Sequence, residues 1–189
     1  MAKAALGDKA QLVVLWAVAL FALPIVLTFA LLLLVGNRFP REIAAGSSLI
    51  VCGLAAALAV LILVNLAVAR RWPDPQIRKF ALVMSAVTSL LGWPIWTVGP
   101  APSVNGMVLG PVQTSLMRLH GLETTHASKS RLLYYWATLA PRDPASAVGA
   151  GRYLIPYETY KRWQIEAPQT VRVSHATGLL GAQVVRDYQ

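Results

Sequence analysis

Three long stretches in the first 117 residues carry no charged side chain: residues 10–37, 43–69 and 80–117. An α-helix rises about 1.5 Å per residue, so about 20 apolar residues cross a hydrocarbon core of about 30 Å. We therefore predict transmembrane helices at about 11–35, 44–69 and 80–98, in a helical domain of residues 1–99. The composition agrees, since 56% of residues are hydrophobic and 13% are charged.

Two of these helices have alternative interpretations. A cleaved signal peptide would need an apolar core of about 7–15 residues, and the first run is longer, so we favour an uncleaved anchor. The third run is diluted by Ser and Thr, and Gly92-Trp93-Pro94 is expected to break or kink it. A re-entrant or surface-lying segment at 80–98 would put the C-terminal part in the cytoplasm.

Four basic side chains crowd the segment between the second and third apolar runs. We take Arg70, Arg71, Arg78 and Lys79 as the topology-determining residues. Basic residues in short loops are retained on the cytoplasmic side. Together with Lys3 and Lys9 they make six on one side, against Arg38 and Arg41 on the other. This count predicts a cytoplasmic N-terminus and, after three crossings, a periplasmic C-terminal domain in a bacterial inner membrane.

The formal charge of +9 raises the question of a nucleic-acid partner. The densest basic cluster flanks apolar spans, where membrane orientation already explains it. We therefore expect no nucleic-acid partner. The expected partners are the lipid bilayer and other membrane-protein subunits, because the small residues of the second run allow close helix–helix contact.

The chain after the third run is predicted to be a linker, residues 100–120, followed by a small extracytoplasmic β domain, residues 121–189. Turn residues from Pro100 to Gly106 indicate the linker. Alternation and aromatic content predict strands. They lie at 132–139, 153–155, 170–175 and 182–186, with a helical turn at 156–163. The predicted fold class is membrane α + β: three N-terminal transmembrane helices followed by a small antiparallel β domain, either a sheet or a partly open barrel.

No sequence pattern indicates catalysis, a cofactor or a metal. His120 and His126 are spaced for neither a helical nor a strand-based metal pair. Ser128, Ser130 and Ser174 lie near His126 or His175, but neither a nucleophile-elbow sequence nor an ordered acid accompanies them. We therefore predict that the chain is not an enzyme and has no cofactor.

Aromatic residues are densest in the predicted β domain, where basic residues interleave with them. Such a group can form a binding face for a partner, or a small β core with amphipathic edges. The candidate partner-binding residues are Tyr134, Tyr135, Trp136, Tyr157, Tyr160 and Trp163.

Residues 121–187 resemble a small β domain of bacterial membrane proteins, the DUF3592-like group. The resembling segments are Leu133–Ala137, Tyr153–Pro156, Tyr157–Tyr160, Thr170–His175 and Gly178–Gly181. The resemblance implies a β domain displayed beside transmembrane helices and implies no activity. In the usual plan of that group the helices bracket the domain, whereas here they all precede it.

These features together predict a non-enzymatic integral membrane protein whose β domain binds another protein. An accessory or assembly subunit of a larger inner-membrane complex is the most concrete form of this hypothesis. A small transporter or channel element, or a membrane-anchored ligand sensor, is the alternative. Transport would need intramembrane charges or a polar file along one helix face, and no Asp, Glu, Lys, Arg or His lies inside any of the predicted spans.

Overall fold

The computed structural model describes residues 2–35, 41–71, 74–126 and 133–189, without the side chains of residues 2–10, 34, 35 and 71. The chain forms two compact units. The helical unit comprises Met1–Asn37 and Leu49–Ser103, and the β unit comprises Arg38–Ser48 and Val104–Gln189. The β unit is therefore assembled from two separate parts of the sequence.

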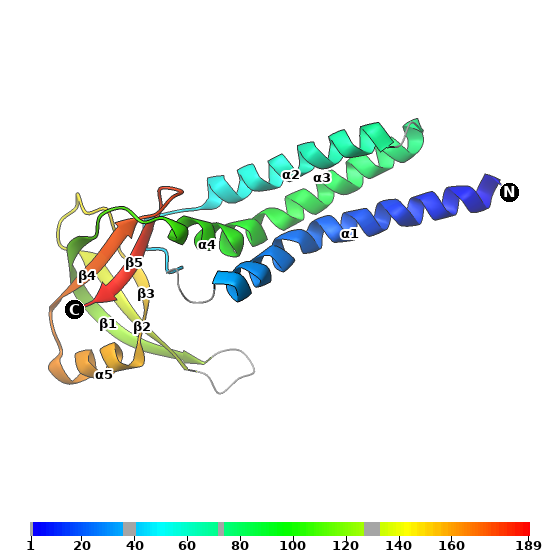
Figure 1. Ribbon diagram of the computed structural model, residues 1–189. Coiled ribbons are helices and arrows are strands. Elements are labelled where there is room, and N and C mark those ends of the chain that lie inside the picture. Colours follow the sequence, from blue (N-terminus) through cyan, green and yellow to red (C-terminus); the bar gives the residue numbers. More distant parts are fainter. Residues whose placement is uncertain (1, 36–40, 72–73, 127–132) are drawn as a thin grey trace. The chain divides into compact units, whose positions relative to one another are not determined.

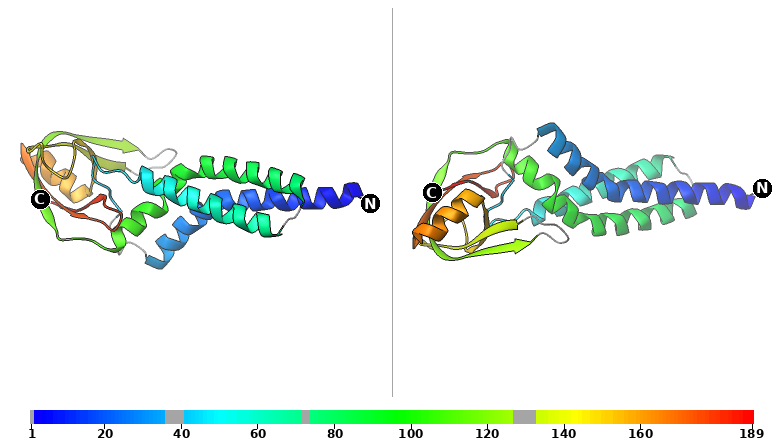
Figure 2. Two further views of the ribbon diagram at one scale, coloured as in Figure 1. Left: turned by 90° about the horizontal axis from the view of Figure 1, so that it is seen from above. Right: turned by 90° about the horizontal axis from the view of Figure 1, so that it is seen from below.

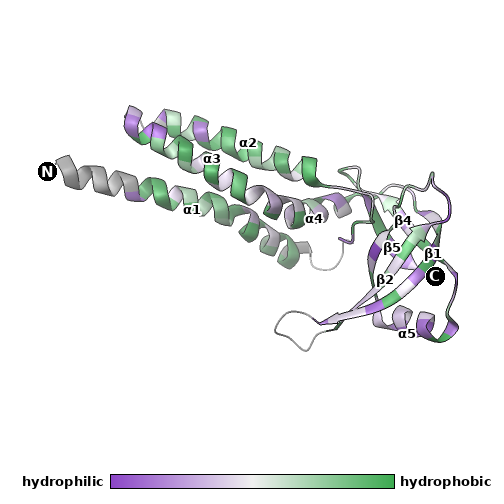
Figure 3. Cartoon of the chain, turned by 180° about the vertical axis from the view of Figure 1, so that it is seen from behind, coloured by the Kyte–Doolittle hydropathy of each residue, from purple (hydrophilic) through white to green (hydrophobic). Residues whose placement is uncertain are grey.

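The helical unit contains the three long apolar helices that the sequence predicts (Figure 1). They are α1 (Ala2–Val35), α2 (Ile50–Arg71) and α3 (Pro75–Val98). Within them the segments long and apolar enough to cross a membrane are Gln11–Leu33, Ile50–Arg70 and Pro75–Val98. Figure 3 shows the hydrophobic colouring along these helices, with polar residues gathered where α2 meets α3.

The boundaries of α2 and α3 differ from the prediction. The second helix begins at Ile50 rather than at residue 44, and the third begins at Pro75 rather than at residue 80. The side chain of Asp74 accepts a hydrogen bond from the backbone N–H of Gln76 at 2.9 Å, and Pro75 occupies the first helical position. Both features start a helix, so the two basic residues at 78 and 79 are helical.

The expected break at Gly92-Trp93-Pro94 does not occur, and α3 continues through Pro94 to Val98. Its hydroxyl side chains bond to backbone carbonyls of the preceding turn. Ser85 Oγ donates to the Ala81 carbonyl at 2.6 Å, and Thr97 Oγ1 donates to the Trp93 carbonyl at 3.1 Å. These bonds satisfy the polar groups without water, so the hydroxyls are compatible with an apolar environment.

Helix α3 packs against both α1 and α2. A Cβ at Gly53 of α2 would lie 2.8 Å from the Thr97 backbone nitrogen, so the two helices touch backbone to backbone there. A Cβ at Gly99, just after α3, would meet the side chain of Thr28 in α1. Gly53, one of the small residues of α2, thus allows close contact with α3. Figure 2 also shows the axis of α1 bending, and Pro24 lies inside this helix.

The β unit is a five-stranded antiparallel sheet that curls into a half-barrel, as predicted (Figure 1). The strand order is β3-β2-β1-β4-β5. The strands are β1 (Gln113–His126), β2 (Leu133–Pro141), β3 (Gly151–Ile155), β4 (Thr170–Thr177) and β5 (Gln183–Tyr188). The predicted linker at 100–120 is wrong, since it contains helix α4 (Pro100–Met107) and the first part of β1, the central strand.

One helix covers the concave face of the sheet (Figure 2). It is α5 (Tyr157–Glu166), which extends the helical turn predicted at 156–163 and ends where Ala167 adopts a left-handed conformation, with φ of 44°. Its Trp163 is 2% exposed and belongs to the core. The core residues of the strands alternate along each strand, as in Val171 and Val173, so one face of the sheet is buried.

The segment between α1 and α2 belongs to the β unit. The backbone N–H of Val185 donates to the Glu42 carbonyl, and that of Ala44 donates to the Gln183 carbonyl, each at 2.9 Å. On the other side the Gly149 N–H donates to the Ala45 carbonyl at 2.6 Å. Residues 42–45 therefore connect β5 with the segment that leads into β3. The strands β5 and β3 are the two edges of the sheet. We call residues 41–48 the closing segment.

This arrangement requires an even number of membrane crossings between residues 48 and 104. The chain leaves the β unit before α2 and returns to it after α3. Because one folded unit lies on one side of a bilayer, α2 and α3 together cross an even number of times. If α2 crosses, α3 crosses as well, so a surface-lying α3 is incompatible with an α2 that spans the membrane.

Candidate functional site

The six aromatic candidates divide between the two faces of the sheet. In β2, Ala137 and Leu139 are fully buried, so Tyr135 shares their inward face while Tyr134 and Trp136 point outward. The Tyr135 ring lies 5.2 Å from the ring of Tyr157 and 5.0 Å from that of Tyr160, between ring centroids. Tyr135 thus joins β2 to α5 and has a packing role.

Trp163 must be removed from the candidate partner-binding residues. It is 2% exposed, and its ring meets that of Tyr188 edge-on with centroids 6.0 Å apart. Its side chain is a central member of the core, where aromatic pairs of this geometry add to stability. Tyr157 of the same helix is 51% exposed and remains available to a partner.

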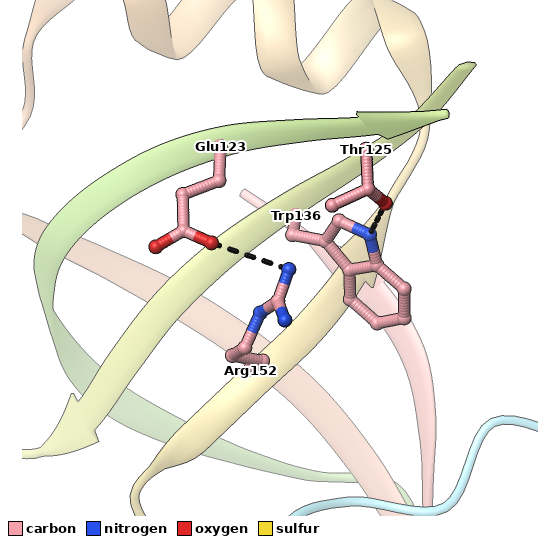
Figure 4. A network of polar contacts seen from close by, with 4 residues as sticks. All are labelled: Glu123, Thr125, Trp136 and Arg152. Carbon is pink, nitrogen blue, oxygen red and sulfur yellow. Dashed lines mark hydrogen bonds and ion pairs between the residues drawn. The ribbon is translucent and has the colours of Figure 1, made fainter. Parts of the chain in front are cut away.

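An ordered group of side chains occupies the outer face of β1, β2 and β3 (Figure 4). The indole Nε1 of Trp136 donates to Thr125 Oγ1 at 2.8 Å. The guanidinium carbon of Arg152 lies 4.9 Å from the Trp136 ring centroid, and its Nη2 lies 3.2 Å from Glu123 Oε2. These contacts hold the Trp136 ring in one orientation against the sheet.

Two exposed apolar side chains flank this group. Tyr134 is 43% exposed and Leu154, which pairs with Trp136 across β2 and β3, is 38% exposed. We define the outer-face patch as Glu123, Thr125, Tyr134, Trp136, Arg152 and Leu154. Leu154 was not among the candidates, although the alternation of Tyr153, Leu154 and Ile155 in a strand could have placed it on the opposite face from the core.

The topology-determining residues lie together at the α2–α3 connection. Arg70 is exposed at the end of α2, and Arg78 and Lys79 are exposed in the first turns of α3. Arg71 is the last residue of α2, and its side chain lies outside the described part of the structure. The structure therefore brings the described members of this group to one end of the helical unit.

A chain of polar side chains runs through one end of the β unit. His175 is 1% exposed, with Nε2 2.9 Å from Ser115 Oγ and Nδ1 3.0 Å from Gln183 Oε1. Ser146 Oγ donates to Ser115 Oγ at 2.9 Å, and Gln183 Nε2 donates to Thr177 Oγ1 at 2.9 Å. The buried His175 ring thereby has a partner at each of its two nitrogens.

This polar chain ends at an open pocket of about 540 Å³. Its lining is partly polar: Thr114, Ser115, Leu116, Arg142, Asp143, Pro144 and Ser146. Ser174 precedes His175 in sequence, but it lies on the outward face of β4 and pairs with Thr114 and Asp187 across the sheet. The serine that contacts His175 is therefore Ser115, which sequence reasoning missed.

The other two histidines, His120 and His126, are not gathered into a metal site with described residues. His120 and His126 are exposed on β1, and among the described residues no three His, Cys, Asp or Glu side chains are grouped to hold a metal. Ser128 and Ser130 lie outside the described residues. Cys52 is half-buried in α2 as a free thiol.

A buried carboxyl group lies where the closing segment meets the sheet. The Tyr188 hydroxyl donates to Glu42 Oε1 and lies 3.0 Å from the Leu154 carbonyl oxygen. Burial raises the pKa of Glu42 to about 7, although hydrogen bonds from Tyr188 and the Leu154 backbone act to lower it. Burial also raises the pKa of Tyr188 far above its usual value, and Glu42 adds to that shift.

Comparisons with protein-family models, with curated proteins and with solved structures each find no match for this chain. The resemblance to the DUF3592-like group therefore stays a prediction.

Proposed function

We propose that this chain is a membrane-anchored binding protein. Its outer-face patch docks a segment of another membrane-protein subunit and has no enzymatic role. The observation that carries the proposal is the ordered Trp136 ring between the exposed apolar side chains of Tyr134 and Leu154. An immobilised aromatic side chain loses little conformational entropy when a partner binds, so its contact area contributes efficiently to affinity.

The polar members of the patch fit the rim of a protein interface. The Arg152–Glu123 pair is about half-exposed on both sides, with exposed side-chain fractions of 49% and 55%. An exposed ion pair of this kind contributes about 0–1 kcal/mol to stability, so folding alone gives little reason for it. It orients the guanidinium over Trp136 and offers polar groups beside an apolar centre, as protein interfaces do.

The expected partner is an extracytoplasmic segment of another inner-membrane subunit, which makes this chain an accessory or assembly subunit. The basic residues at 70, 71, 78 and 79 favour a cytoplasmic α2–α3 connection. If α2 and α3 each cross once, the closing segment and the rest of the β unit lie together on the side opposite to that connection. In a bacterial inner membrane that side is the periplasm.

Photo-crosslinking in the native membrane tests the proposal. A photoreactive phenylalanine replaces Tyr134, and in a matched variant it replaces Arg172, which is exposed on the outer side of β4. We expect position 134 to give an adduct with one identified membrane protein, and position 172 to give none. Adding Leu154→Asp should abolish that adduct, because a buried charge without a partner is costly at an interface.

The proposal fails if position 134 gives no adduct, if positions 134 and 172 capture the same proteins equally, or if Leu154→Asp leaves the adduct unchanged. A thermal melt of each variant shows whether the β unit still folds. Leu154→Ser provides a milder substitution at the same exposed position, and it should reduce the adduct without adding charge.

A further inference from the structure

Outside the outer-face patch, Ser115 and His175 form a hydrogen-bonded pair beside the open pocket. We propose that Ser115 is a nucleophile activated by His175, and that this pocket carries out acyl transfer from a small ester or thioester to water. This activity belongs to a different place in the β unit from the outer-face patch, so neither proposal depends on the other.

The fold brings the two residues together from neighbouring strands. In the β1–β4 pairing Ser115 lies opposite Val173, and Gln113 lies opposite His175, so Ser115 and His175 are diagonal neighbours on the inward face. Their separation in sequence is 60 residues. Each of the two strands has a hydrogen-bonded neighbour on both sides, and their pairing holds nucleophile and base within hydrogen-bond distance.

The hydrogen bonds assign the protons of this group. Because the Gln183 amide nitrogen donates to Thr177, its oxygen Oε1 faces His175 and accepts from Nδ1–H. Nε2 of the neutral imidazole then has a lone pair, and it accepts the hydroxyl proton of Ser115. This is the orientation a general base needs, with one ring nitrogen oriented by an oxygen acceptor and the other on the nucleophile.

The surroundings allow a substrate in the pocket to reach Ser115 but not His175. Ser115 lines the pocket, whereas His175 is 1% exposed and has no direct access to solvent. The Ser146 hydroxyl, 2.9 Å from Ser115 Oγ, and the Arg142 side chain on the pocket wall are the polar groups beside the point of attack. The open pocket, about 540 Å³ in volume, gives a small substrate access to the Ser115 hydroxyl.

Ser115 and His175 supply the nucleophile and the proton acceptor that the reaction needs. Ser115 Oγ forms a bond to the carbonyl carbon while its proton passes to His175 Nε2, and the carbonyl π electrons move to the oxygen. When that oxygen re-forms its double bond, the leaving alkoxide or thiolate departs and takes the proton from Nε2. Water then repeats the sequence on the acyl-serine and releases a carboxylic acid. Gln183 is a positioning residue, because it acts through His175.

Covalent labelling of the full chain in mild detergent is the direct test. A fluorophosphonate forms a Ser Oγ–P bond, and fluoride leaves while the proton goes to His175. We expect mass spectrometry to place the adduct on Ser115 in the unaltered protein. Ser115→Ala should abolish it, and His175→Gln should slow it at least about 100-fold, the lower end of what general-base assistance contributes. Ser174→Ala, on the opposite face of β4, is the matched control and should label at the original rate.

A further variant separates activation from structure. Gln183→Glu places a carboxylate where the amide oxygen accepts from Nδ1, which stabilises the imidazolium that forms during attack, so labelling should become faster. The proposal is overturned if the unaltered protein gives no adduct at Ser115. It is also overturned if a folded His175→Gln protein labels at the original rate, or if Ser174→Ala labels as slowly as His175→Gln.

Discussion

The carboxyl group of Glu42 accepts a hydrogen bond from the hydroxyl of Tyr188, 146 residues further along the chain. Glu42 belongs to the closing segment just ahead of the second apolar helix, and Tyr188 is the penultimate residue of the chain. The same hydroxyl contacts the Leu154 carbonyl of β3, so three distant segments meet at one phenol. This point joins the two ends of the curled sheet.

This junction predicts that the stability of the β unit falls as the pH rises through about 7. The pKa of Glu42 is about 7 when folded and near its ordinary value of 4.5 when unfolded, because burial disfavours the carboxylate. Between these values the folded state holds a proton that the unfolded state has lost. The contribution of Glu42 to the free energy of unfolding is therefore fully present below pH 4.5 and is lost by pH 7–8. The free energy of unfolding falls by about 3 kcal/mol over this range.

Glu42→Gln tests this dependence, since an amide can still accept from Tyr188 and does not titrate. We expect the variant to match the original protein at pH 4 and its β unit to melt roughly 12–24 °C higher at pH 8.5. Melting curves in mild detergent across this pH range provide the measurement. Parallel curves for the two proteins at every pH would show that Glu42 keeps its ordinary pKa.

The docking of the closing segment predicts a strong effect at Gly149. A Cβ at this position would lie 2.9 Å from both the Ala45 carbonyl oxygen and the Gly46 Cα, which are backbone atoms. Gly149→Ala should therefore displace residues 45 and 46, weaken the Gly149 N–H bond to Ala45 and cost about 1–3 kcal/mol. The midpoint of thermal or denaturant unfolding measures the loss.

Gly121→Ala is the matched control, because a Cβ at Gly121 meets no atom within 4 Å. It should change stability little, and a strand alanine has less backbone freedom to lose than glycine. Equal destabilisation by the two substitutions would mean that contact with the closing segment does not set the requirement at Gly149.

Apolar length was sufficient to predict the helical unit, whereas the closing segment has no comparable signal. Ala44 is 1% exposed in the β core, and residues 43–48 carry no charge, so this part of the segment continues the uncharged run of the second helix. Hydropathy alone assigned it to the second helix for that reason. Only its pairing with Gln183 and Val185 distinguishes it, and such long-range pairing is not visible in a local pattern.

The central strand β1 was missed for a related reason. Ser115, Met117 and Leu119 alternate on the inward face, but the register shifts between Leu119 and Gly121 when β1 pairs with β2. After that irregularity Leu122 takes the inward position, so the period of two is interrupted. The contact between Ser115 and His175 depends on this strand, which is why the candidate site could not be assembled from sequence.

The contact between α2 and α3 predicts opposite results for two helix glycines. A Cβ at Gly53 would lie 2.8 and 2.9 Å from the backbone N and Cα of Thr97, so Gly53→Ala should push the helices apart and lower stability by about 1–3 kcal/mol. Gly92 of α3 has no atom within 4 Å of such a Cβ. Gly92→Ala should instead stabilise the helix by up to about 1 kcal/mol.

Loss of helical circular dichroism with temperature in micelles measures both variants. A melting point lowered by Gly53→Ala and raised or unchanged by Gly92→Ala is the expected pair of results. If Gly53→Ala is as stable as the original, α2 and α3 do not approach through this glycine in the membrane.

The shared β unit predicts where three surface positions are accessible. Single cysteines replace Ser48, Gln76 and Gln189 in a Cys52→Ser background, and a membrane-impermeant maleimide is added to intact bacterial cells with a permeable outer membrane. Positions 48 and 189 belong to one folded unit, so they should label together, and position 76 should label only after the inner membrane is opened. If 76 labels from outside while 48 and 189 are protected, the orientation is inverted but the fold stands. If 48 and 189 label from opposite sides, the closing segment cannot pair with β5, and the half-barrel described above is not the structure in the membrane.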